Sequence, residues 1–268
     1  MMKVTLIGAG NLATQLGKSL HRAGVEICQV FSRTEESART LAGLLDADWL
    51  TDVSRLRSDA DIYVLSVKDS VLCRLIPEVC KGRGDKLFLH TAGSMPMRCF
   101  EGQARHYGVF YPMQTFSKNH EVCFADIPVF IEGNTQETEE QIRNFARRLS
   151  RRIFSLSSSD RQYLHLAAVW ACNFTNYCYG VASKLLGEHG IPFDVMLPLI
   201  DETTRKIHKS APAEAQTGPA VRGDRNVMRR QLALMDGRSD LQELYRLISA
   251  GIGEEASAIH AAPDEESH

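Results

Sequence analysis

Residues 3–13, KVTLIGAGNLA, decide the fold of the first half of the chain. The β-branched run at 3–7 leads directly into the pattern GxGxxA at 8–13, and leucines then recur every fourth residue over 12–20. This spacing predicts a strand, a tight turn and an amphipathic helix, and the run at 25–31 predicts a second strand. A GxGxxA pattern in this context, within about 30 residues, is typical of a βαβ unit that binds a dinucleotide.

Each position of the turn has a chemical reason. Gly8 permits the tight turn, and Gly10 lets the backbone approach a pyrophosphate because no Cβ stands in the way. Ala13 lets the helix pack close to the sheet, while Asn11 and Leu12 lie in the first helical turn, whose unpaired N–H groups attract phosphate. The alternative is a glycine turn that merely joins strand to helix, and the flanking elements favour the dinucleotide site.

The end of the second expected strand indicates which dinucleotide binds. An NAD site carries Asp or Glu at this point, where the carboxylate bonds the ribose 2′-OH. This chain has Ser32, Arg33 and Thr34 instead. Because a guanidinium flanked by two hydroxyls suits a 2′-phosphate, the sequence predicts NADP as the cofactor.

Strands and helices continue to alternate up to about residue 156. We expect strands over 61–67, 86–90, 107–111, 128–132 and 152–156, and helices over 34–45, 69–80 and 135–149. This alternation predicts a mostly parallel sheet covered on both faces, with ligands at the carboxyl ends of its strands. The residues expected there, beside the cofactor, are Ser66, Val67, Lys68, Thr91 and Gly93. Lys68 could equally be a surface lysine at the rim, and His90 reads better as a satisfied core histidine.

From residue 159 the alternation stops and helices follow one another. A single helix is expected over 160–188, and others over 193–208, 224–235 and 240–252. The chain is therefore divided into an α/β Rossmann domain over 1–156, an all-α domain over 157–260, and a disordered acidic tail over 261–268.

The long expected helix carries His165, Asn173 and Asn176. At about 100° per residue His165 and Asn176 share a face, with Asn173 at its edge. Apolar neighbours predict that this face is substantially buried, so its polar groups need partners. Two interpretations stay open: a catalytic site formed by the three side chains, or ordinary helix–helix hydrogen bonding.

A second group of unusual residues is the segment GPAVRGD at 218–224. Its glycines and proline fix the backbone, and Asp224 is placed to cap the next helix. Arg222 could hold a carboxylate or phosphate of a substrate. The alternative is a structural loop in which Arg222 pairs with a neighbouring acid.

Composition excludes several classes of function. The net charge of −2 argues against nucleic-acid binding. No apolar run approaches the roughly 20 residues that cross a bilayer, and the start of the chain has no signal-peptide pattern, so we expect a cytoplasmic protein without membrane contact. Seven cysteines without a CxxC pair predict neither a disulfide framework nor a metal site.

Several motifs resemble known families over nearly the whole chain. GAGNLATQLGKSL, VFSRT and VLSVKD resemble the N-terminal half of pyrroline-5-carboxylate reductase, and FYPMQTF resembles a strand-end loop of related reductases. LAAVWACNFTNYCYGVA and GPAVRGD resemble a helical domain known as domain of unknown function number 2520. The resemblance implies a C-terminal domain similar to that of 6-phosphogluconate dehydrogenase, whose relatives are commonly dimers, so we expect a homodimer formed through the helical domain.

One departure from that wider group bears on the chemistry. In its 3-hydroxyacid dehydrogenases a catalytic lysine precedes an asparagine by four residues, whereas Asn173 here is preceded by Val169. The missing lysine argues against ordinary hydroxyacid oxidation and leaves His165 as the group available for proton transfer. One hypothesis, favoured by the clustered His and Asn residues, is an NADP-dependent oxidoreductase that reduces a small C=O or C=N substrate, with His165 as proton donor and Asn173 and Asn176 orienting the substrate. The alternative is a non-catalytic NADP-binding protein whose helical domain is a dimer or partner interface.

Overall fold

The computed structural model describes residues 1–261, with side chains up to 259. The described chain forms two compact units, residues 1–177 and residues 178 onward. The first unit holds the whole sheet and the beginning of the helical region. The acidic tail expected to be disordered lies outside the described residues from 262 on, and residue 261 ends a helix.

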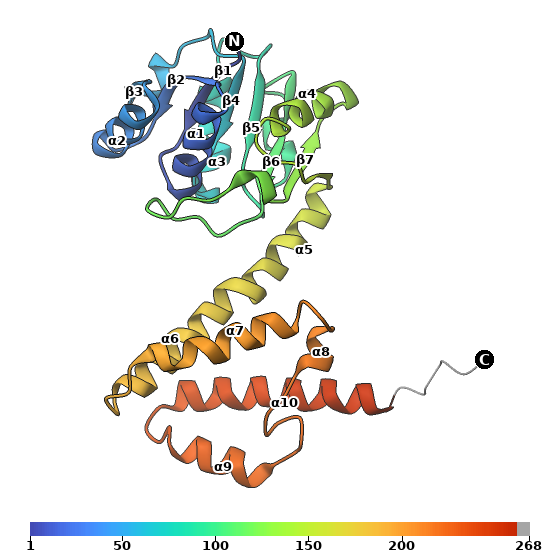
Figure 1. Ribbon diagram of the computed structural model, residues 1–268. Helices are drawn as coiled ribbons and strands as arrows, with labels where there is room; N and C mark the ends of the chain where they lie inside the picture. The colour runs from blue at the N-terminus through green and yellow to red at the C-terminus, as the bar shows by residue number, and fades with distance from the viewer. Residues whose placement is uncertain (262–268) are drawn as a thin grey trace, which may run out of the picture. The chain divides into compact units, whose positions relative to one another are not determined.

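One sheet organises the first unit (Figure 1). Its strands lie in the order β3-β2-β1-β4-β5-β6-β7-β8. All neighbours are parallel except β6 and β7, which confirms the mostly parallel sheet. The strands are β1 (Lys3–Ile7), β2 (Glu26–Phe31), β3 (Asp48–Leu50), β4 (Ile62–Leu65), β5 (Leu87–His90), β6 (His106–Pro112), β7 (Val129–Gly133) and β8 (Ile153–Ser155).

The helices between the strands agree closely with the sequence. They are α1 (Asn11–Arg22), α2 (Glu35–Leu45), α3 (Asp69–Cys80) and α4 (Gln136–Ala146). Pro77 lies inside α3 without ending it before Cys80. Strand β3 was not expected, because three residues at a sheet edge are too short to carry a hydrophobic period.

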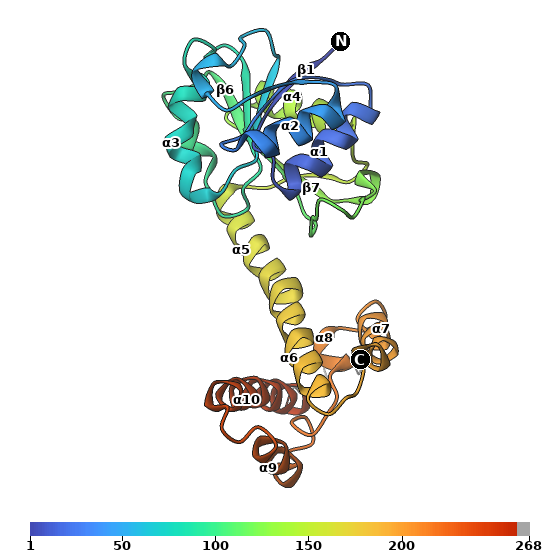
Figure 2. The ribbon, with the colours of Figure 1, turned by 90° about the vertical axis from the view of Figure 1, so that its left-hand side faces the viewer.

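Helices cover both faces of the sheet, as Figure 2 shows. Alternate residues of β1 point to opposite faces, so Val4 and Leu6 join one core and Ile7 joins the other. The first core packs against α1, α2 and α4, and the second against α3 and the 3₁₀ turn η2 (Met97–Phe100). Leu16 and Ile76, one from each core, are fully buried.

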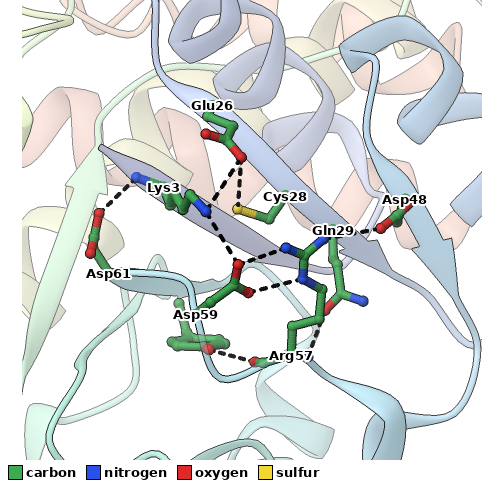
Figure 3. A network of polar contacts seen from close by, with 9 residues as sticks. Lys3, Glu26, Cys28, Gln29, Asp48, Arg57, Asp59 and Asp61 are labelled. Atoms are coloured by element: carbon green, nitrogen blue, oxygen red, sulfur yellow. Dashed lines mark hydrogen bonds and ion pairs between the residues drawn. The ribbon is translucent and has the colours of Figure 1, made fainter. Parts of the chain in front are cut away.

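The amino-terminal ends of the strands are held by a polar network (Figure 3). Lys3 at the start of β1 pairs with Asp59 at 3.2 Å, and Asp59 also accepts from Arg57 at 2.6 Å. Those hydrogen bonds hold the pKa of Asp59 at about 2. The backbone N–H of Lys3 donates to Asp61 at 2.8 Å. This end of the sheet is thus closed by ion pairs, which leaves the carboxyl ends for binding.

The helical region begins after β8 with three consecutive helical segments. They are α5 (Ser158–Ala168), the π-helix η4 (Val169–Phe174) and α6 (Thr175–Gly187). The π-helical turn rotates the chain less per residue than an α-helix does, so the 100° count from His165 to Asn176 does not hold. Asn173 and Asn176 are exposed, so the expectation of a buried polar face is wrong for the single chain. Neighbouring apolar residues predict burial only if another element packs on them, and Leu166 and Trp170 beside these asparagines are themselves 51% and 63% exposed.

The second unit continues with helices only. These are the 3₁₀ turn η5 (Phe193–Met196) and helices α7 (Leu197–Lys206), α8 (Pro212–Ala215), α9 (Arg225–Ala233) and α10 (Ser239–Ala261). Asp224 caps α9 as expected, because its carboxylate accepts from the N–H of Val227 at 3.1 Å. Within the part of the chain that is described, no helix is both long and apolar enough to cross a membrane.

Candidate functional site

A cleft of about 910 Å³ opens at the carboxyl ends of the strands in the first unit. It brings together the expected cofactor residues Gly8, Gly10, Asn11, Leu12, Ser32, Arg33, Thr34, Ser66, Val67, Lys68, Thr91 and Gly93. Ala13 does not line it, because its methyl group is fully buried where α1 packs on the sheet. His165 of α5 lines the same cleft. The volume lies within the range of sites that hold small molecules and cofactors.

The glycine loop is built for one backbone path. Gly8 has φ +122°, and a Cβ placed there would lie 2.1 Å from the carbonyl oxygen of Ser66. The loop is fixed by the bond from Gly8 N–H to Phe31 O at 2.8 Å. A Cβ at Gly10, by contrast, would meet nothing within 4 Å, since it would face the open cleft beside the first turn of α1. That turn offers N–H groups and the positive end of the helix dipole to a phosphate.

The end of the cleft beside β2 is cationic. Arg33 is exposed, and within residues 1–259 it forms no hydrogen bond or ion pair. Thr34 stands at the N-cap of α2, yet its hydroxyl makes no capping bond. Ser37 of α2 and Arg74 of α3 line the cleft with them, and sequence reasoning missed both. The position of Arg74 could have been predicted from that of Lys68. Helix α3 begins directly after Lys68, at the carboxyl end of the sheet, so its first two turns lie beside the cleft.

His165 is held by a second residue that sequence reasoning missed. Tyr111, near the end of β6, has its hydroxyl 3.0 Å from Nδ1 of His165, and the two rings meet edge to face at 77°. Both side chains line the cleft. No local signal in the sequence marks Tyr111, because only the parallel pairing of β6 with β5 brings the last residues of β6 to the same end of the sheet as Thr91.

The start of α5 is fastened to the sheet, which places His165. Arg161, whose side chain is 1% exposed, pairs with Glu132 of β7 at 2.7 Å and donates to the carbonyl of Met95 at 2.6 Å. Glu132 also accepts from the N–H and the hydroxyl of Ser158 at 2.9 and 2.6 Å. These bonds fix the first turn of α5, and His165 follows one helical turn after Arg161.

His90, the histidine expected in the core, is the last residue of β5. His90 is fully buried, and its Nδ1 accepts from the N–H of Ala92 at 3.2 Å. Burial lowers its pKa to about 3, so the imidazole is neutral at physiological pH. Among the described residues, its Nε2 has no hydrogen-bond partner. His90 is therefore a core residue that is satisfied on one nitrogen.

The remaining expected site residues lie elsewhere. Asn173 and Asn176 do not line the cleft with His165. Arg222 is exposed in the second unit, and within the described chain it forms no ion pair, so the expected pairing with a neighbouring acid is not present there. In residues 1–261, no cluster of three or more His, Cys, Asp or Glu side chains is arranged to hold a metal ion. All seven cysteines are free thiols.

Two protein families match the chain, and the second match begins at residue 127, within the sheet of the first unit. Residues 3–92 match the family described as NADP oxidoreductase coenzyme F420-dependent, and residues 127–252 match a domain of unknown function, DUF2520. The first match covers the glycine loop and the Ser32-Arg33-Thr34 segment. No curated protein matches this chain.

Solved structures extend the comparison to the full length. A candidate NADP oxidoreductase from Bacteroides fragilis is 50% identical with a TM-score of 0.91, over 94% of this chain and 98% of that one. A protein from Thermotoga maritima is 21% identical (TM-score 0.70; 96% and 99% covered). An imine reductase from Myxococcus stipitatus in complex with NADP⁺ is 17% identical (TM-score 0.67; 97% and 95% covered), which shows a shared fold. The chain belongs to the family of NADP oxidoreductases in which a Rossmann domain precedes DUF2520.

Proposed function

We propose that this protein binds NADP(H) in the cleft of its first unit and uses it to reduce a small C=O or C=N compound. One observation carries the proposal: a single cleft gathers the glycine loop, the cationic Arg33 segment and His165. These three features are what a nicotinamide-dependent reductase needs, namely a pyrophosphate cradle, a 2′-phosphate site and a proton donor.

The residues present fit the cofactor at both ends. The open space in front of Gly10 suits the pyrophosphate, and the guanidinium of Arg33 suits a 2′-phosphate. Arg74 and Glu78, one helical turn apart on α3, line the same cleft. When bound, the cofactor supplies the hydride, and the chain supplies position and electrostatics.

His165 is the side chain we propose as the proton donor. Its imidazole can carry and donate a proton, and it lines the cleft on the first turns of α5, which the Arg161–Glu132 ion pair holds against the sheet. Asn173 and Asn176 remain proposed substrate contacts, as does Arg222 for an anionic group of the substrate. In the single chain only His165 of these four lines the cleft.

The variant Arg33→Ala tests the cofactor site. We expect its Kd for NADPH to rise about 10- to 100-fold, because a charge-assisted contact to the 2′-phosphate contributes about 1.5–3 kcal/mol. The Kd for NADH should stay the same, since NADH has no 2′-phosphate. Fluorescence titration with each nucleotide measures both constants.

The matched control is Arg39→Ala, which removes an arginine of α2 that pairs with Glu35 and does not line the cleft. Equal loss in both variants would contradict a 2′-phosphate site at Arg33. NADPH oxidation with cyclic imines and 2-oxo acids then tests catalysis. Intact NADPH binding without turnover of any of them would favour the alternative, a non-catalytic NADP-binding protein.

We also propose that the protein is a homodimer formed through its helical region. From residue 162 to residue 183 the sequence has no Asp, Glu, Lys or Arg. Along this stretch large aromatic and aliphatic side chains are 45–75% exposed, namely Tyr163, Leu166, Trp170, Phe174 and Tyr177.

The second unit gives an independent reason for the dimer. Among its residues with described side chains only Met235 is buried, while Leu234 and Leu247 are more than half exposed. A helical unit with so few buried side chains needs an apolar partner surface, and a second copy presents one of the same kind.

We expect the wild type to sediment as a dimer at micromolar concentration and Trp170→Glu to sediment as a monomer, because a carboxylate would be buried without a partner. Analytical ultracentrifugation measures this. Leu44→Glu, at an exposed leucine of α2, is the control and should stay dimeric. A monomeric wild type would sink the proposal.

A further inference from the structure

The cleft contains one pair of polar side chains in direct contact, Tyr111 and His165. The hydroxyl of Tyr111 lies 3.0 Å from Nδ1 of His165. Tyr111 is only 9% exposed, so water competes little with this hydrogen bond. Because Tyr111 belongs to β6 and His165 to α5, this contact joins the carboxyl end of an inner strand to the first helix of the helical region.

Gly93 fixes the position of the imidazole from the other side. A Cβ at Gly93 would lie 2.6 Å from Nδ1 and 2.7 Å from Cγ of His165, closer than any ordinary contact. The ring therefore lies directly against the loop after β5, where only a glycine leaves room. Two hydrogen bonds of Ser94 hold this loop in place. Its hydroxyl donates to Asp69, and its backbone carbonyl accepts from the side-chain amide of Gln162 at 3.0 Å.

The chemistry of the pair sets the direction of the hydrogen bond. A phenol is a better donor than acceptor, and the unprotonated nitrogen of a neutral imidazole is a strong acceptor. If Tyr111 donates to Nδ1, the proton of the neutral imidazole lies on Nε2. Within the described residues Nε2 has no protein partner, so its N–H is available to a ligand in the cleft.

The charged groups around the pair are compatible with this direction. Burial raises the pKa of Tyr111, and the nearby guanidinium of Arg161 opposes that rise, so the phenol keeps its proton at neutral pH. Arg161 is itself neutralised by Glu132 of β7. His90, on β5, is neutral because burial lowers its pKa to about 3.

We propose that Tyr111 is a positioning residue: it holds His165 as the Nε2–H tautomer, so that this N–H faces the cleft and donates its proton to the reduced substrate. This inference rests on the proposed role of His165 and names the nitrogen that performs it. With NADP(H) bound, its hydride would go to the substrate carbon as the C=O or C=N π bond breaks, and the substrate oxygen or nitrogen would take the proton from Nε2 while Nδ1 takes the hydroxyl proton of Tyr111. The imidazole thus stays neutral, and the phenolate of Tyr111 would regain its proton from water.

The test is nuclear magnetic resonance of the full-length protein with ¹⁵N-labelled histidine, whose two ring nitrogens report the tautomer directly. We expect His165 of the wild type, assigned by its loss in His165→Gln, to be mainly the Nε2–H form. In Tyr111→Phe the tautomer ratio should move about tenfold toward Nδ1–H, the factor that corresponds to one ordinary hydrogen bond. Tyr163→Phe, at an exposed tyrosine of α5, should leave the spectrum unchanged.

Two results would overturn the inference: a wild-type His165 that carries its proton on Nδ1, or identical His165 signals in the wild type and Tyr111→Phe. The wild-type spectrum decides even if the Phe variant does not fold. NADPH titration of the same samples separates this outcome from failure of the proposed function, because Tyr111→Phe leaves the glycine loop and Arg33 intact.

Discussion

Replacing Gly8 by alanine is expected to lower the free energy of unfolding by about 4 kcal/mol. Two costs of about 1–3 kcal/mol each add up: an alanine at φ +122°, and a Cβ pressed to 2.1 Å from the carbonyl oxygen of Ser66. That carbonyl cannot move away freely, because Ser66 is bonded through its N–H to Ile7 at 2.8 Å. Urea unfolding followed by circular dichroism measures the change.

Gly10→Ala is the matched control, because it separates folding from binding. Gly10 has φ −79° and open space around its missing Cβ, so this variant should lose less than about 1 kcal/mol of stability. Its Kd for NADPH should nevertheless rise, because the methyl group would occupy the space of the pyrophosphate. A Gly10→Ala protein that binds NADPH as tightly as the wild type would contradict the placement of the pyrophosphate at this loop.

Glu132→Ala should destabilise the first unit by about 3–5 kcal/mol. The substitution leaves the guanidinium of Arg161, which is 1% exposed, without a counter-charge. It also removes the acceptor of the Ser158 N–H and hydroxyl at the start of α5. Denaturant unfolding measures the loss, and a constant m-value would show that the same surface is exposed on unfolding.

Two further variants make the explanation specific. The double variant Glu132→Met with Arg161→Met removes both charges and should be more stable than Glu132→Ala, because no unpaired charge remains buried. Glu121→Ala removes a partner of Arg22 in a pair whose side chains are both more than half exposed, and should show no measurable change. A double variant that is less stable than Glu132→Ala would contradict the explanation that the unpaired buried charge of Arg161 causes the loss of stability.

The sequence determined the first half of the chain almost element by element. Residues 3–13 set the strand, turn and helix, because each needs only local spacing and the backbone freedom of Gly8. The cofactor residues followed from the same logic, since the carboxyl ends of neighbouring parallel strands must meet at one edge. Twelve of the thirteen expected cofactor residues line the cleft, and Ala13 supports it from below.

The tertiary structure decided what periodicity cannot express. Whether the face of His165, Asn173 and Asn176 is buried depends on what packs against it, and a π-helical turn changes which of these residues share a side. Tyr111 could be recognised only once β6 was placed beside β5, because its partner lies 54 residues away in the chain. The turn at Gly8 depends on neighbouring residues and can be predicted from them. The contact between Tyr111 and His165 depends on the pairing of distant strands and on the ion pair that holds α5 to β7, which only the tertiary structure shows.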